Sequence, residues 1–148
     1  MSGDLYTRLG CSFAAFRDRI FIEEAARTWT YGQIETAAGR LATRLLELGL
    51  APGERLLAQT DKSIEAIVLY FACLRVGAIY LPLNTDYTEA EIAYFLADAE
   101  PALAVCREQS IELFGRLGGG KLEVRTLDQL FTDLPQAEVA PASPRGRC

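Results

Sequence analysis

The chain has 148 residues, of which 50% are hydrophobic and 24% are charged, as expected of one globular domain and not of a disordered chain. A formal net charge of −5 without a Lys/Arg cluster argues against nucleic-acid binding. With no histidine and no closely spaced pair among its four cysteines, the chain lacks the usual residues of a zinc site and of a histidine-activated nucleophile.

Two further observations bear on where in the cell the protein is located. No positively charged segment followed by an apolar run begins the chain, so no signal peptide is expected. The longest apolar stretch, Ala66–Leu74, is far shorter than the ~20 residues that a membrane helix needs. We therefore expect a soluble, cytoplasmic protein in which Cys73 and Cys106 are small buried apolar residues.

The first elements are predicted from spacing and composition. Apolar residues at helical spacing predict a helix over Asp4–Phe16, and two β-rich runs, Arg19–Glu23 and Thr28–Thr30, predict a hairpin. Thr30 and Gln33 then form a capping box, in which each residue hydrogen-bonds to the main chain of the other. The helix that follows is expected to end before Gly49, where a left-handed residue is favoured.

Strands and helices alternate through the rest of the chain. Further capping boxes are predicted at Thr88/Glu91 and at Thr126/Gln129. The expected strands are Arg55–Thr60, Ala78–Pro82, Ala102–Cys106 and Leu122–Arg125, and the expected helices are Ser63–Val76, Thr88–Ala99, Ser110–Leu117 and a brief one at Leu130–Phe131. This alternation predicts an α/β fold, a layered parallel-type sheet with flanking helices.

The end of the chain has a different character. Val139–Cys148 is rich in Pro, Ala and Arg and has no apolar period. We therefore divide the chain into a partial domain over residues 1–134 and a tail over residues 135–148 that is disordered or read out of frame.

Few residues suggest chemistry. Gly115–Lys121 (GRLGGGK) has the spacing of a phosphate-binding loop. However, Leu122 follows where such a loop needs Ser or Thr, and the segment lies between a helix and a strand, whereas the loop requires a strand before it and a helix after it. The alternative is a glycine turn that ends a helix. The segment Lys62–Ser63 stands where α/β sheets bind ligands, and Lys62 either contacts an anion or faces solvent beside an N-capping Ser63. The segment Pro82–Thr85, at the end of the next strand, either borders the same ligand-binding edge of the sheet or forms a turn of defined conformation.

Three segments carry a resemblance to a known family. Arg27–Tyr31 with Ile34 resembles the "(L/W)-T-Y-x-x-(L/I)" opening of adenylate-forming enzymes, and Cys73–Asn84 resembles their "L-(K/R)-x-G-A-x-(Y/F)-x-P-(L/I)-(N/D)" signature. Between them, Leu48–Arg55 matches the family's Gly-containing turn. Within that family, the residues Asp61–Ser63, Tyr80–Thr85, Tyr87–Thr88 and Asp98–Pro101 are most similar to those of the malonyl-CoA synthetases.

The resemblance implies a role within a larger enzyme. It covers roughly Leu5–Phe131 and corresponds to the first third or less of a full-length acid–CoA ligase of fatty acid metabolism, which uses ATP, Mg²⁺ and CoA to convert malonate or another carboxylic acid into its thioester. The family's phosphate loop, magnesium-binding glutamate, acid pocket and catalytic lysine are expected beyond this chain. No catalytic, cofactor-binding or metal-binding residue is therefore assigned, and none of these cofactors is expected to bind tightly.

Three hypotheses follow. The first is an inactive N-terminal fragment of a ligase, produced by a frameshift, an early stop or a mis-called reading frame. The second is one half of a split ligase, which would expose an apolar face that its partner chain, the remainder of the enzyme, covers. The third is a stand-alone α/β binding module, which requires a stable monomer and a ligand.

Overall fold

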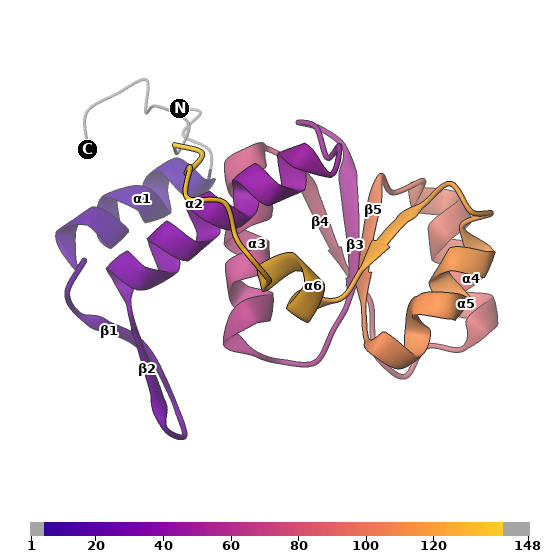
Figure 1. The fold of residues 1–148 in the computed structure, drawn as a ribbon, viewed down its shortest axis with the longest axis horizontal. Coiled ribbons are helices and arrows are strands. Elements are labelled where there is room, and N and C mark those ends of the chain that lie inside the picture. Colours follow the sequence, from indigo (N-terminus) through magenta and orange to yellow (C-terminus); the bar gives the residue numbers. More distant parts are fainter. Residues whose placement is uncertain (1–4, 141–148) are drawn as a thin grey trace.

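The computed structural model describes residues 5–140, which form a small hairpin and a parallel α/β layer (Figure 1). Helix α1 (Leu5–Ala15) precedes strands β1 (Ile20–Glu24) and β2 (Arg27–Thr30), which pair antiparallel. The predicted first helix and hairpin are thus confirmed, while the expected helix start at Asp4 lies outside the described residues.

Helix α2 (Tyr31–Glu47) begins and ends where the sequence predicts. The Gln33 amide donates to Thr30 Oγ1 at 3.2 Å, and the Thr30 amide donates to Gln33 Oε1 at 2.9 Å. Trp29 packs against the core that contains Ile34, as a hydrophobic staple should. Gly49 has φ +93°, a conformation that costs glycine little because it has no Cβ.

Within residues 5–140, four strands form a parallel sheet in the order β4-β3-β5-β6. The strands are β3 (Arg55–Gln59), β4 (Ile79–Pro82), β5 (Leu103–Cys106) and β6 (Glu123–Arg125). The helical elements are α3 (Ile64–Val76), α4 (Glu89–Ala99), the 3₁₀ turn η1 (Glu108–Ser110), α5 (Ile111–Leu117) and α6 (Leu127–Phe131). The predicted α/β class and all three capping boxes are confirmed.

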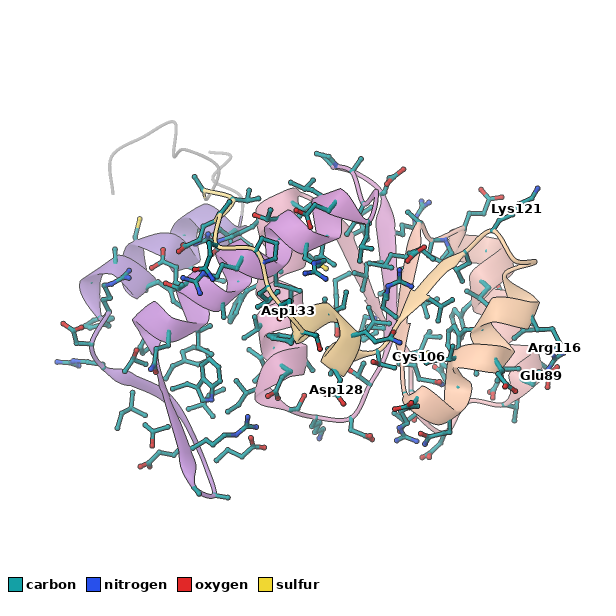
Figure 2. All side chains as sticks on the ribbon, viewed as in Figure 1. Glu89, Cys106, Arg116, Lys121, Asp128 and Asp133 are labelled. Carbon is teal, nitrogen blue, oxygen red and sulfur yellow. The ribbon has the colours of Figure 1, made fainter. Side chains whose placement is uncertain are left out.

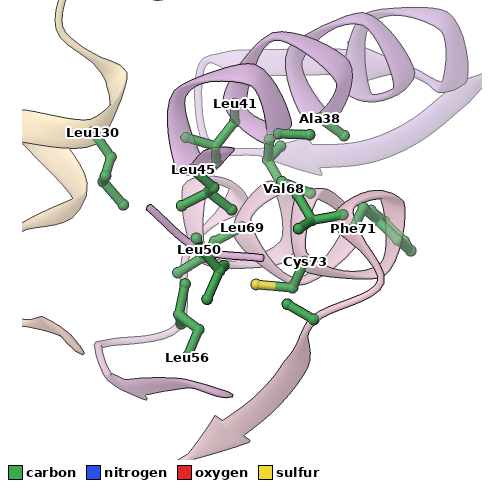
Figure 3. Packing of buried hydrophobic residues seen from close by; sticks show 14 of the residues in the cluster. Ala38, Leu41, Leu45, Leu50, Leu56, Val68, Leu69, Phe71, Cys73 and Leu130 are labelled. Carbon is green, nitrogen blue, oxygen red and sulfur yellow. The ribbon is translucent and has the colours of Figure 1, made fainter. Parts of the chain in front are cut away.

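The sheet separates two apolar clusters because successive side chains of a strand point to opposite faces. Leu56 and Ala58 enter the larger core, where α2, α3 and α6 pack; Figure 3 shows Leu41, Leu69 and Leu130 of these helices in the same cluster as Leu56. Leu57 enters the smaller core on the other face with α4 and α5. Cys73 is buried in the larger core and Cys106 in the smaller one, as expected.

An aromatic cluster ties the first helix and the hairpin to the larger core. The Phe13 ring of α1 lies 5.8 Å from the Phe21 ring of β1 and 5.3 Å from the rings of Tyr31 and Phe71, measured between centroids. The stacked and edge-on geometries are those that aromatic pairs favour. The hairpin is therefore anchored by side chains, although its strands do not join the parallel sheet.

The segment 132–140, called here the strap, runs back along α2 (Figure 1). Arg44 donates to the Asp133 carbonyl at 2.6 Å, Thr43 donates to the Ala137 carbonyl at 2.8 Å, and the Val139 amide donates to the Gly39 carbonyl at 3.1 Å. Part of the stretch that we expected to lack order thus makes specific contacts. The remainder of that expectation, for residues 141–148, lies outside the described part of the chain.

The capping box of α4 makes stability depend on pH. Glu91 accepts from the Thr88 amide at 2.7 Å and from the Thr88 hydroxyl at 2.8 Å, and these hydrogen bonds hold the pKa of Glu91 below its usual 4.5. Because the folded-state pKa is the lower one, the contribution is present above about pH 4.5 and is lost as the pH falls through the folded value.

We expect the melting temperature of the Glu91→Gln variant to fall less than that of the parent chain between about pH 6 and pH 3. Glutamine keeps the capping acceptor, as Gln33 and Gln129 show in the other two boxes, but does not titrate. Thermal unfolding followed by circular dichroism at stepped pH measures both curves. If the melting temperatures of the parent chain and the variant fell in parallel over the whole pH range, Glu91 would not be the source of the pH dependence.

Candidate functional site

The carboxyl ends of β3 and β5 define the position at which this kind of sheet usually binds ligands. From β3 the chain passes through α3, on the larger-core face, to β4 at one side of the sheet. From β5 it passes through α5, on the smaller-core face, to β6 at the other side. Because the two connections diverge, a crevice opens between neighbouring strand ends, the switch point of an open α/β sheet.

A hollow of about 240 Å³ lies at this switch point. Three loops line it, each following a strand of the sheet, and Figure 2 shows two of the lining residues, Cys106 and Asp128. The lining residues are Thr60, Asp61, Ser63, Cys106, Arg107, Glu108, Gln109, Thr126, Leu127 and Asp128. We call this hollow the switch-point crevice.

One ion pair crosses the mouth of the switch-point crevice. Arg107 donates from Nε to Asp61 Oδ2 at 3.1 Å and from Nη2 to Asp61 Oδ1 at 2.5 Å. The Asp61 side chain is 70% exposed, so water screens the pair and its contribution to stability is at most about 1 kcal/mol. With Asp61, Glu108 and Asp128 against a single arginine, the lining is acidic and does not favour an anionic ligand.

Lys62 and Ser63 have separate roles. Ser63 Oγ accepts from the Ala66 amide at 3.1 Å and caps α3, as the capping alternative predicts. Lys62 and Ser63 also border a different hollow, of about 380 Å³, formed with Ala66, Ile67, Tyr70 and Tyr80. This lining is mainly apolar and offers an anion little besides the lysine itself.

The segment Pro82–Thr85 forms a turn of defined conformation. Asn84 Oδ1 accepts from the Asp86 amide at 2.9 Å, an Asx turn. The Asn84 carbonyl accepts from Gln59 Nε2, also at 2.9 Å, and Gln59 is buried. The sequence reasoning did not single out Gln59, although a polar residue inside an otherwise apolar strand is a signal of such a buried hydrogen bond.

The Gly115–Lys121 segment is a glycine turn and not a phosphate cradle. The Gly118 amide donates to Phe114 O at 2.8 Å, and the Gly120 amide donates to Gly115 O at 3.2 Å. These amides therefore complete the end of α5 and do not point to a ligand. Lys121 precedes β6 and lies at the upper right of Figure 2, away from Cys106 and Asp128.

Other kinds of site are not found in residues 5–140. No group of three or more His, Cys, Asp or Glu side chains in this range is placed to hold a metal ion. Nor does any helix in the described range have the length and apolar character to cross a membrane. The described residues thus offer a crevice at the sheet edge without a cluster of three or more metal-ligating side chains.

The two buried thiols are expected to be unreactive. Burial raises the pKa of Cys106 to about 11 and that of Cys73 to about 12, so that roughly one molecule in a thousand, or fewer, carries the thiolate at pH 8. We expect iodoacetamide to label both cysteines at least ~100-fold more slowly in the native chain than in urea. Peptide mapping by mass spectrometry measures each site, and rapid native labelling of Cys106 would show that the crevice opens to solvent.

Comparisons with known proteins identify relatives. The family described as AMP-binding enzyme matches residues 12–144. The structure of ATP-bound MatB from Rhodopseudomonas palustris aligns with a TM-score of 0.83 and 35% identity, over 97% of this chain and 30% of MatB. Acyl-CoA ligase SID4 of Ajellomyces capsulatus is 38% identical over 80 residues, 54% of this chain and 14% of the ligase.

A relative from a different class of enzyme is also similar. Nonribosomal peptide synthetase inpB of Emericella nidulans is 30% identical over 128 residues, which is 82% of this chain and 6% of the synthetase. The chain thus spans less than a third of the length of each of these three relatives. The similarity to MatB extends over nearly the whole chain, whereas that to SID4 covers about half of it.

Proposed function

Because the chain belongs to the AMP-binding enzyme family, we propose that it forms the first α/β layer of an ATP-dependent, AMP-forming acid–CoA ligase. The observation that carries this proposal is the alignment with ATP-bound MatB at 35% identity over 97% of the chain. In such a reaction the carboxylate attacks the α-phosphorus of ATP and pyrophosphate leaves. The CoA thiol then attacks the acyl-adenylate, and AMP leaves.

Malonate is our proposed acid. The resemblance of Asp61–Ser63 and Tyr80–Thr85 to malonyl-CoA synthetases supports it, and similarity to the acyl-CoA ligase SID4 supports transfer to CoA. The peptide synthetase inpB supports the second candidate, activation of an amino acid. Comparing malonate with amino acids in the experiment below distinguishes the two.

We further propose that the chain alone does not catalyse either step. Within the described range, the glycine amides near Lys121 are bonded to their own helix, and no acidic cluster suits Mg²⁺. The residues present therefore do not fit the metal, and nothing in this part of the chain would stabilise the charge that develops on the phosphates. We expect no ATP–pyrophosphate exchange above background from the purified chain.

A graft tests the function directly. The chain would replace the aligned segment of R. palustris MatB, and acid-dependent pyrophosphate release would be measured with malonate and with amino acids. We expect malonate-dependent release, while the same MatB lacking the segment serves as the inactive control. A folded graft without activity towards any acid would contradict the proposed function, and activity with amino acids alone would contradict malonate.

One observation favours a split ligase that needs a partner chain. Among the described residues no strand pairs with the outer side of β4, and Ile79 of that strand is 44% exposed. An unpaired strand edge that exposes an apolar side chain favours a partner. Restored pyrophosphate exchange on titration with the separately produced remainder of the enzyme would support the split form.

A stable, two-state monomer that binds a ligand by itself would support the binding module instead.

A further inference from the structure

Arg75 is a buried cation on α3 with partners on several segments of the chain. Its side chain is 2% exposed. The Nε atom donates to the Tyr6 hydroxyl of α1, and the guanidinium carbon lies 5.2 Å from the centre of the Tyr6 ring. The Nη2 atom lies 3.5 Å from Glu35 Oε1 of α2. Arg75 therefore joins α1, α2 and α3.

The remaining arm of the guanidinium holds the strap. Arg75 Nη1 donates to the Val139 carbonyl at 2.5 Å, and the Val139 amide donates to the Gly39 carbonyl at 3.1 Å. Both polar groups of the Val139 main chain are thus bound, one by α3 and one by α2. A residue held at both its amide and its carbonyl has one register along the helix.

Gly39 provides the space for this contact. A Cβ atom at residue 39 would lie 2.5 Å from Arg75 Nη1, closer than real Cβ contacts, and 3.0 Å from Glu138 Cβ, tighter than most of them. Gly39 has no left-handed conformation to explain its identity, because its φ is not positive. The close approach of the strap and of Arg75 explains the glycine instead.

Hydrogen bonds hold the strap through its main chain, while the side chains of Leu134 and Val139 pack against the larger core. Arg44 and Thr43 bind the carbonyls of Asp133 and Ala137, just as Arg75 binds that of Val139. We propose that Arg75 and Gly39 form a socket that positions the strap on α2 by its main chain. They are positioning residues, and this role does not depend on which acid the enzyme activates.

The shape of the arginine fork is essential to the socket. A guanidinium donates in three fixed directions, here to Tyr6, Glu35 and Val139, whereas a lysine ammonium is a compact charge on a flexible stem. Lysine at position 75 would keep the charge opposite Glu35 but could not hold all three partners. The Arg75→Lys variant therefore separates the socket from the buried ion pair.

Amide hydrogen exchange in the full 148-residue chain, read residue by residue by NMR, tests the socket. In Arg75→Lys we expect the Val139 amide to exchange at least ~10-fold faster than in the parent chain, with core amides such as that of Leu69 unchanged. The matched control is Arg55→Lys, because Arg55 also donates to a carbonyl, that of Ala99 at 3.2 Å, but lies away from the strap.

A second pair of variants leaves Arg75 itself unchanged. Gly39→Ala is expected to accelerate exchange at Val139 in the same way, whereas Gly10→Ala, also within a helix but with open space around the added methyl, is not. Unchanged exchange at Val139 in folded Arg75→Lys or Gly39→Ala would overturn the proposal. An equal acceleration at Val139 and Leu69 would also overturn it, because it would show a merely structural effect.

Discussion

Phe114→Ala is expected to lower the free energy of unfolding by about 3–5 kcal/mol. Phe114 is fully buried at the centre of the smaller core, where it packs with Leu57, Ile92 and Leu96. Truncation removes most of an aromatic side chain and leaves a cavity between α5 and the sheet, which the parallel strands cannot close without breaking their pairing.

Tyr94→Ala is the matched control for Phe114→Ala. Tyr94 lies on α4, which covers the same face of the sheet, but its side chain is 65% exposed. Its truncation is expected to change stability by less than about 1 kcal/mol. Urea unfolding followed by circular dichroism measures both variants. Equal midpoints for the two would show that the smaller core is not packed as described.

Glu35→Ala is expected to cost about 3 kcal/mol, because it leaves the buried Arg75 without its carboxylate partner. Glu35 also lies 3.2 Å from the exposed Arg17, but that contact is screened by water and contributes little. The expected loss is therefore mainly the cost of an uncompensated charge in the protein interior.

Two controls isolate this cost. Glu89→Ala removes an exposed partner of Arg116 and is expected to change stability by less than about 1 kcal/mol. The double variant Glu35→Ala/Arg75→Met removes both charges and is expected to regain stability relative to Glu35→Ala, because a buried ion pair can often be replaced by apolar side chains. A double variant less stable than the single one would contradict the charge argument.

The elements of this fold follow from local signals. Thr30/Gln33, Thr88/Glu91 and Thr126/Gln129 each act over three residues, so the helix starts could be predicted without tertiary information. The strand order could not be predicted in this way. The pairing of Leu56 with Leu103 joins residues far apart in the chain, and no pattern within either strand specifies it.

The features that the sequence reasoning missed share one cause. Arg75 stands in the last turn of α3, where a basic residue ordinarily faces solvent and interacts with the helix dipole. Its burial depends on Tyr6 and Val139, which lie on segments remote in sequence. The strap was overlooked because α2 binds its main chain and only Leu134 and Val139 pack against the core, so its side chains carry no periodic signal of the contact.

The candidate site was anticipated in part. The edge formed by the strand ends was predicted, and Ser63 caps its helix as one alternative required. The switch-point crevice itself was not predicted, because its position depends on β5 lying beside β3 and not beside β4. The pairing of Asp61 with Arg107 across its mouth depends on the same neighbour relation.

The strand order β4-β3-β5-β6 also bears on how the chain folds. Pairing of Arg55 with Ile79 closes a loop that contains little more than α3, whereas pairing of Leu56 with Leu103 closes one roughly twice as long. Loop-closure entropy rises with length, and distant pairings form late. The unit of β3, α3 and β4 is therefore expected to assemble first and to present the free edge of β3 as the template onto which β5, and then β6, are added.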